Sequence, residues 1–109
     1  MGLKTMAIDV KSLDAITNRP VRLGVLVALQ IDGSLDYPAL KERLAVSERS
    51  LALNLGKLEE AQYIRCEEAC AGQRPKSIYH IAPLGRKALA NYLDAMQSII
   101  DSVNNAKVK

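Results

Sequence analysis

The chain has 109 residues and a formal net charge of +3, with 49% hydrophobic and 25% charged residues. This length is typical of one domain, and this apolar content excludes an intrinsically disordered chain. The longest unbroken apolar run extends only from Val25 to Leu29. Because about 20 residues are needed to cross a bilayer, the sequence excludes a transmembrane protein.

The apolar residues favour helices over strands. Phe and Trp are absent and there are four Tyr, whereas Leu and Ala dominate. Leu and Ala have high helix propensity, while aromatic residues favour strands. A chain this short buries a limited core on its own, so we expect a helical protein that associates with itself.

The two cysteines, Cys66 and Cys70, are four positions apart in a predicted strand. Four strand residues span about 13 Å, whereas disulfide-linked Cα atoms lie within roughly 7 Å, so we expect free, half-buried thiols rather than an internal bridge. A redox sensor is the alternative. Residues 1–10 lack the apolar stretch of a secretory signal, and together these features predict a cytoplasmic protein.

The first predicted elements are a short amphipathic stretch at Leu13–Thr17 and a helix at 21–30. The sequence Asn18-Arg19-Pro20 ends the first, and Pro20 suits the first turn of the second. A turn at Asp32-Gly33-Ser34 then follows.

The next elements predict a helix-turn-helix. Leu35 is expected to form a minimal strand bridge. Asp36 caps a helix that ends at about Leu44, and Ser47 caps a third helix from Glu48 to about Ala61. The short link between the two helices is typical of this motif. The third helix carries one predicted buried stripe of Leu51, Leu55 and Leu58.

A hairpin and a long helix complete the chain. Alternation from Tyr63 predicts one strand, Ile78–Ile81 predicts a second, and residues 71–76 form a polar, basic loop between them. Pro83 begins the last helix. Its apolar face contains Leu84, Ala88, Leu89, Tyr92, Leu93, Met96, Ile99, Ile100 and Val103.

The charges favour a nucleic-acid partner. Between Ala69 and Leu93 there are four basic residues and no acidic one, although short basic clusters are also common on solvated surfaces. On the third helix, Arg49 can pair with guanine, Asn54 with adenine, and Ser50 with a base or a phosphate. Lys57 would reach a phosphate. Leu53 at the exposed edge can touch a thymine methyl group, the predicted hairpin or a partner protein, and the sequence does not decide among them.

The stretch from Leu13 to Leu93 resembles the small MarR-type winged-helix transcriptional regulators, in particular the compact single-domain group. The segments NRPVRLGVLVAL, LKERLAVSERSLALNLGKLEEAQYI and AGQRPKSIYHIAPLGRKAL carry this resemblance. It implies a homodimer that regulates genes through palindromic operators. It also implies DNA contacts at Ser47, Arg49, Ser50, Asn54, Lys57, Arg74 and Lys76. The last helix would be the dimerisation arm, with an interface of Leu89, Tyr92, Leu93, Met96, Ile99, Ile100 and Val103.

Three positions depart from the family pattern. Gln62 stands where a glycine usually ends the helix in the left-handed conformation, and Ala82 replaces a Thr cap before the last helix. Gly56 replaces a usual Lys or Arg, which weakens the helix and removes one potential phosphate contact.

The sequence shows no grouping of residues that suits catalysis. We therefore expect no active site, cofactor or metal. The lone His80 has no neighbouring nucleophile or base and is expected on the outer face of the hairpin, where a phosphate contact is the alternative. The six glycines are scattered and form no phosphate loop.

We therefore predict a mostly α protein with a small β-hairpin (α+β), a winged helix-turn-helix with a long C-terminal dimerisation helix. It would bind double-stranded DNA as a homodimer, with residues 47–61 in the major groove and a wing at 71–77 on the flanking backbone and minor groove. A winged-helix protein–protein module and a ligand-sensing regulator of unknown effector are the alternatives. The expected regions are an N-terminal extension (1–12), the winged helix-turn-helix (13–82), the dimerisation helix (83–104) and a frayed tail (105–109).

Overall fold

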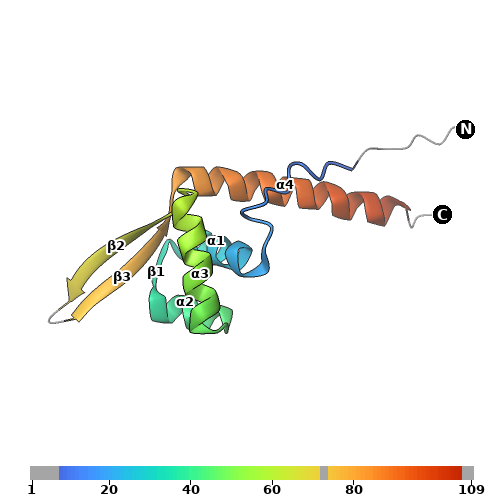
Figure 1. Ribbon diagram of the computed structural model, residues 1–109. Coiled ribbons are helices and arrows are strands. Elements are labelled where there is room, and N and C mark those ends of the chain that lie inside the picture. Colours follow the sequence, from blue (N-terminus) through green and yellow to red (C-terminus); the bar gives the residue numbers. More distant parts are fainter. Residues whose placement is uncertain (1–7, 72–73, 107–109) are drawn as a thin grey trace, which may run out of the picture.

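The computed structural model describes residues 8–71 and 74–106, except for the side chains of Cys70, Ala71 and Arg74. Its elements are α1 (Pro20–Asp32), β1 (Ser34–Asp36), α2 (Tyr37–Leu44), α3 (Glu48–Glu60), β2 (Ile64–Ala71), β3 (Arg74–Ile81) and α4 (Pro83–Ala106). Figure 1 shows α4 lying along one side of the cluster of α1, α2 and α3, while β2 and β3 extend from the cluster as a ribbon. The predicted winged-helix fold class is confirmed.

Side-chain caps fix the helix-turn-helix. The Asp36 carboxylate accepts a hydrogen bond from the backbone N–H of Ala39 at 2.9 Å, and the Ser47 hydroxyl accepts one from the N–H of Ser50 at 3.1 Å. Between the two helices, Ala45 adopts the left-handed conformation with a φ of 53°. Both predicted caps are confirmed, and they set where α3 begins relative to α2.

Gln62 ends α3 in the left-handed conformation, with a φ of 65°. Its N–H donates to the carbonyl of Glu59, and the next N–H, of Tyr63, donates to the carbonyl of Leu58, both at 2.9 Å. These two bonds form a Schellman motif, which usually contains glycine at this position. The chain therefore turns from α3 directly into β2 despite the non-glycine residue.

The sheet has the strand order β1-β3-β2 and is antiparallel throughout. Leu35 pairs with Tyr79, so the predicted bridge at Leu35 is confirmed. The wing is longer than predicted, because backbone pairing continues to Ala71 and Arg74. Residues 74–76, expected in the loop, belong to β3.

Aliphatic side chains from all four helices and the inner face of the sheet form the core. The predicted leucine stripe of α3 is buried, since Leu51, Leu55 and Leu58 are at most 2% exposed. Each such side chain contributes about 1.5–3 kcal/mol when it is removed from water. The other core residues include Val25, Leu26, Leu29, Leu40, Ile64, Tyr79, Ile81 and Leu89. The stripe fixes which face of α3 is left outside.

The two halves of α4 have different surroundings. In the first half, Leu89 and Tyr92 are 3% and 4% exposed within this chain, so they fill its own core and do not lie on the surface predicted for a partner. The remaining predicted interface residues are half-buried or exposed: Leu93, Met96, Ile99, Ile100 and Val103.

Within residues 8–71 and 74–106, no helix has the length and apolarity to span a membrane.

The end of α4 also differs from the prediction. The helix continues through Ala106, whereas the tail was expected to begin at 105. No Gly or Pro interrupts the sequence there, and polar side chains are compatible with an exposed helix end. Residues 107–109 lie outside the described part.

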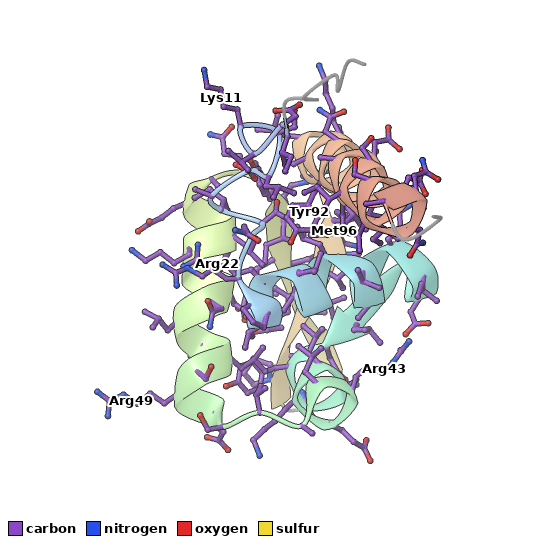
Figure 2. The ribbon with its side chains drawn as sticks, turned by 90° about the vertical axis from the view of Figure 1, so that its right-hand side faces the viewer. Lys11, Arg22, Arg43, Arg49, Tyr92 and Met96 are labelled. Atoms are coloured by element: carbon purple, nitrogen blue, oxygen red, sulfur yellow. The ribbon has the colours of Figure 1, made fainter. Side chains whose placement is uncertain are left out.

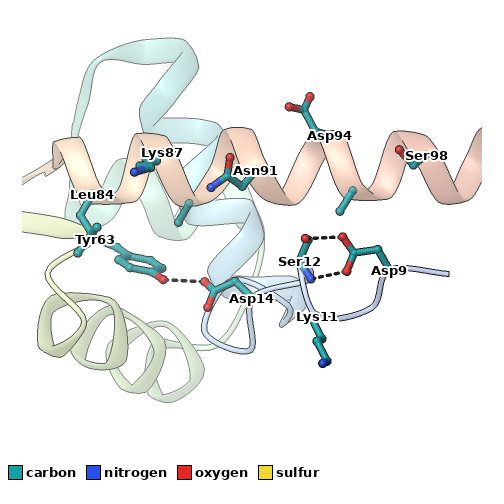
Figure 3. Close-up of a pocket in the computed structure, with 12 residues that line it drawn as sticks. Asp9, Lys11, Ser12, Asp14, Tyr63, Leu84, Lys87, Asn91, Asp94 and Ser98 are labelled. Carbon is teal, nitrogen blue, oxygen red and sulfur yellow. Dashed lines mark hydrogen bonds between the residues drawn. The ribbon is translucent and has the colours of Figure 1, made fainter. Parts of the chain in front are cut away.

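The stretch Leu13–Thr17 forms turns rather than a helix and is held against the body (Figure 3). The Asp14 carboxylate accepts hydrogen bonds from the hydroxyls of Tyr63 and Thr17, both at 2.8 Å. Burial raises the pKa of Asp14, but these hydrogen bonds outweigh it and hold the pKa below its ordinary value. Burial and the Asp14 carboxylate raise the pKa of Tyr63 to about 12. Nearby, the hydroxyl of Tyr92 on α4 donates a hydrogen bond to Asn18 Oδ1 at 2.9 Å.

Candidate nucleic-acid interface

The outward face of α3 lies opposite its leucine stripe. Successive residues of a helix are rotated by about 100°, so with Leu51 and Leu55 turned inward, Arg49, Leu53 and Gly56 lie on the outer side. Arg49 is exposed and points away from the body in Figure 2. The side chain of Leu53 is 62% exposed.

The two serines at the start of α3 are partly engaged in its cap. The Ser47 hydroxyl accepts a hydrogen bond from Ser50, which leaves its O–H available as a donor. Ser50 itself is half-buried. The positive end of the helix dipole lies here, so this end of α3 favours an anionic partner such as a phosphate.

Asn54, predicted to pair with adenine, is half-buried and hydrogen-bonded within the protein. Its Oδ1 accepts a hydrogen bond from Arg22 Nε at 2.9 Å, and its Nδ2 donates to the carbonyl of Ser50 at 2.8 Å. Arg22 also donates to the carbonyl of Ile16 at 3.3 Å. The Asn54 side chain is thus turned toward α1 and fixes α3 against α1 and the N-terminal segment.

Arg22 is the residue of this region that sequence reasoning missed. It is half-buried, and Figure 2 shows its side chain beside α3. The available signal was one charged residue in the otherwise apolar helix VRLGVLVAL. That signal does not name a partner, because Asn54 is 32 residues away in the chain.

Charge changes sign along α3. Lys57 is exposed one turn beyond Leu53, but the helix ends with the exposed acidic residues Glu59 and Glu60. Glu48 is the acidic residue of the first turn. The side of α3 that carries Arg49 and Lys57 therefore attracts a polyanion, whereas Glu59 and Glu60 repel one at the end of the helix.

The predicted contact residues of the wing, the β2–β3 hairpin, differ in what the structure shows of their surroundings. Lys76 Nζ lies 3.4 Å from Asp36 Oδ2, so this predicted contact forms a partly exposed ion pair that links β3 to β1. The side chain of Arg74 lies outside the described residues. His80 Nε2 lies 2.9 Å from Glu67 Oε1 on the outer face of the sheet, the face predicted for it.

Cys66 is a free, half-buried thiol, as predicted. In the sheet it pairs with Tyr79 of β3. Burial and the hydrogen bond with this thiol raise the pKa of Tyr79. The side chain of Cys70 is outside the described part.

A cavity of about 590 Å³ lies between α4 and the N-terminal segment (Figure 3). Lys87, Asn91 and Ser98 line it from α4, and Asp9 and Lys11 line it from the opposite side. The lining of this cavity is mixed polar and apolar.

The exposed basic side of α3 beside a two-stranded wing has counterparts in known proteins. Residues 21–100 match the family model described as a winged helix DNA-binding domain. The chain belongs to this family. This winged helix domain is 32% identical over 78 residues to an uncharacterized protein of Methanocaldococcus jannaschii, covering 72% of this chain and 85% of that protein.

Solved structures share the fold of the winged helix domain. A transcriptional regulator homologue from Pyrococcus horikoshii superposes with a TM-score of 0.79 at 20% identity, covering 85% of this chain and 93% of that one. A MarR family transcriptional regulator from Silicibacter pomeroyi has a TM-score of 0.65 at 21% identity, covering 86% of this chain and 62% of that one. The fold is thus that of MarR-type regulators, and the family is one of DNA-binding domains rather than of enzymes.

Proposed function

We propose that the protein is a transcriptional regulator that binds double-stranded DNA as a homodimer at a palindromic operator. In this proposal α3 enters the major groove, and the wing lies on the flanking backbone and minor groove. A DNA-binding protein of this kind acts in the compartment that holds the DNA. We propose that this compartment is the cytoplasm, as expected from the free cysteines. The observation that carries the proposal is the exposed outer side of α3. Within residues 8–71 and 74–106, the side chains of Arg49 and Lys57 form no hydrogen bond or ion pair.

The side chains divide into two roles. Arg49 has the reach and the planar donors to pair with guanine, and it gives sequence readout. Ser47, Ser50 and Lys57, with Lys76 on the wing, contact phosphates and fix the orientation of the protein on the duplex. A phosphate replaces Asp36 as the partner of Lys76, an exchange favoured because that ion pair is partly exposed. Arg74 is assigned to the same phosphate contacts by its place at the start of β3.

The second half of α4 supplies the dimer contact. Leu93, Ile100 and Val103 are 43–53% exposed on a helix that runs beyond the body, and the half-buried Met96 and Ile99 lie beside them. A second copy would cover this apolar surface. Two copies of α3 then reach successive major grooves, whose centres are about 34 Å apart.

The experiment measures DNA affinity against salt for fragments selected from random DNA. Each phosphate contact releases counterions, so binding should weaken steeply as salt rises. We expect Lys57→Ala to reduce the salt slope by about 1, the value for a single phosphate contact. The substitution should weaken binding to all DNA sequences by the same factor. Arg49→Ala should cost about 1–3 kcal/mol and relax the preference at one base pair.

Lys87→Ala is the matched control, because Lys87 is also an exposed helical lysine but lies on α4. It should leave both affinity and salt slope unchanged. Absence of binding at low salt contradicts the proposal and supports the protein–protein module. Equal effects of Lys57→Ala and Lys87→Ala contradict the placement of α3 on DNA.

A further inference from the structure

Leu53 has an unusual environment for a leucine in this helix. The other three leucines of α3 are at most 2% exposed, whereas Leu53 is 62% exposed. No part of the described chain covers it, and it lies on the side of α3 that faces away from the core. A single exposed leucine does not by itself indicate a contact. The surface around Leu53 therefore decides what it can bind.

The helix surface around Leu53 is open to close approach. A Cβ placed on Gly56, one turn later on the same side, would meet no atom within 4 Å. Internal packing therefore does not require a glycine there, and glycine disfavours the helix. Its effect is to leave bare backbone beside the leucine side chain.

The neighbouring charges indicate what approaches this surface. Arg49 lies one turn before Leu53 and Lys57 one turn after it, so the leucine is flanked by two exposed cations. This arrangement suits a polyanion better than an apolar protein surface. Among the groups at the floor of the major groove, the C5-methyl of thymine is the apolar one.

The position of Asn54 supports an apolar contact. Because Arg22 and the Ser50 carbonyl hold its amide, Asn54 does not present its hydrogen-bonding groups on the outer side of α3. Arg49 and Leu53 are then exposed side chains on the outer side of this helix. We infer that Leu53 is a specificity-determining residue that recognises a thymine methyl group in the operator. This inference rests on the proposed function.

Replacing thymine by deoxyuridine tests the inference, because it removes only the methyl group. The measurement is fluorescence anisotropy of a labelled duplex from the selection, with each thymine replaced in turn. For the wild-type chain, we expect one thymine per half-site at which the replacement raises the Kd about fourfold, the value for one buried methyl group. The Leu53→Ala variant should bind the thymine duplex and the deoxyuridine duplex with the same Kd.

Ile31→Ala is the control, because Ile31 is an equally exposed aliphatic residue (66%) at the end of α1. It should keep the full response to deoxyuridine. Circular dichroism of both variants should match the wild type, since both side chains are exposed.

Four results overturn the inference. If wild-type DNA binding is specific but no thymine responds, or if the response persists in Leu53→Ala, Leu53 does not read a methyl group and the proposed function stands. If Leu53→Ala instead changes the oligomeric state without any methyl effect, Leu53 is a protein contact. If the wild-type chain binds no DNA, the proposed function fails as well.

Discussion

Two helical glycines, Gly85 and Gly56, have opposite surroundings. A Cβ on Gly85 would lie 2.1 Å from the carbonyl oxygen of Tyr63, where α4 crosses the start of β2. A Cβ on Gly56 would meet nothing within 4 Å. Gly85 therefore permits a backbone contact that any other residue prevents, whereas no contact in the described chain requires a glycine at position 56.

These surroundings give opposite effects of the same substitution. We expect Gly85→Ala to lower the free energy of unfolding by about 3 kcal/mol, because backbone atoms must move to relieve the overlap. Gly56→Ala should raise it by about 1 kcal/mol through helix propensity. Urea denaturation followed by circular dichroism, at one fixed protein concentration, measures both changes. Similar effects of the two substitutions would show that the close approach of α4 to β2 is absent.

The role of a single residue could be predicted from the sequence where that role depends on neighbouring residues in the chain. The positions of Asp36 and Ser47 predicted both caps, and the family pattern predicted an unfavourable left-handed residue at Gln62, whose φ is 65°. The requirement at Gly85 was not predictable, because it depends on the carbonyl of Tyr63, 22 positions earlier. The internal role of Asn54 was missed for the same reason.

At the scale of elements, the N-terminal segment is attached to the body by hydrogen bonds rather than by a helix. The bond from Tyr63 to Asp14 joins this segment to the junction of α3 and β2. Tyr63→Phe removes that bond and keeps the ring, and we expect it to lower the free energy of unfolding by about 1 kcal/mol at neutral pH.

This loss should depend on pH. The pKa of Asp14 is lower in the folded chain than in the unfolded one, so its ionised form stabilises the fold. The contribution is present above the ordinary carboxyl pKa of about 4 and is lost as the pH falls below it. The difference between wild type and Tyr63→Phe should therefore shrink between pH 5 and pH 3 by about 1 kcal/mol at most. A difference that stays constant over this range would contradict the role of the Asp14 carboxylate.

Element boundaries were predictable to different degrees. The bounds of α2 and α3 followed from caps and periodicity, which are properties of neighbouring residues. The length of the wing did not, because strand pairing joins residues on both sides of a loop, such as Cys66 with Tyr79. The end of α4 was placed too early, since polar residues alone do not terminate a helix.

At the scale of the whole molecule, α4 joins a buried half to an exposed half. Leu89 packs into the core of the chain, whereas Leu93, Ile100 and Val103 are 43–53% exposed. The apolar face of α4 was predictable from its periodicity. Its division between core and surface was not, because this depends on where α1 and the N-terminal segment end along the helix.

In the proposed dimer, the exposed half of α4 would set the distance between the two DNA-binding faces. Leu93→Glu places a charge in the proposed dimer contact, and we expect a monomer that protects at most one half-site. Ile31→Glu introduces the same charge at another exposed aliphatic position and should leave the dimer intact.

The central claim is that each protomer of a dimer places α3 in a major groove. A hydroxyl-radical footprint of the wild-type chain on a selected DNA fragment tests it most directly. We predict two related protected segments whose centres lie one helical turn apart, about 34 Å along the duplex. One protected segment, or protection unchanged in Arg49→Ala and Leu93→Glu alike, would contradict the claim.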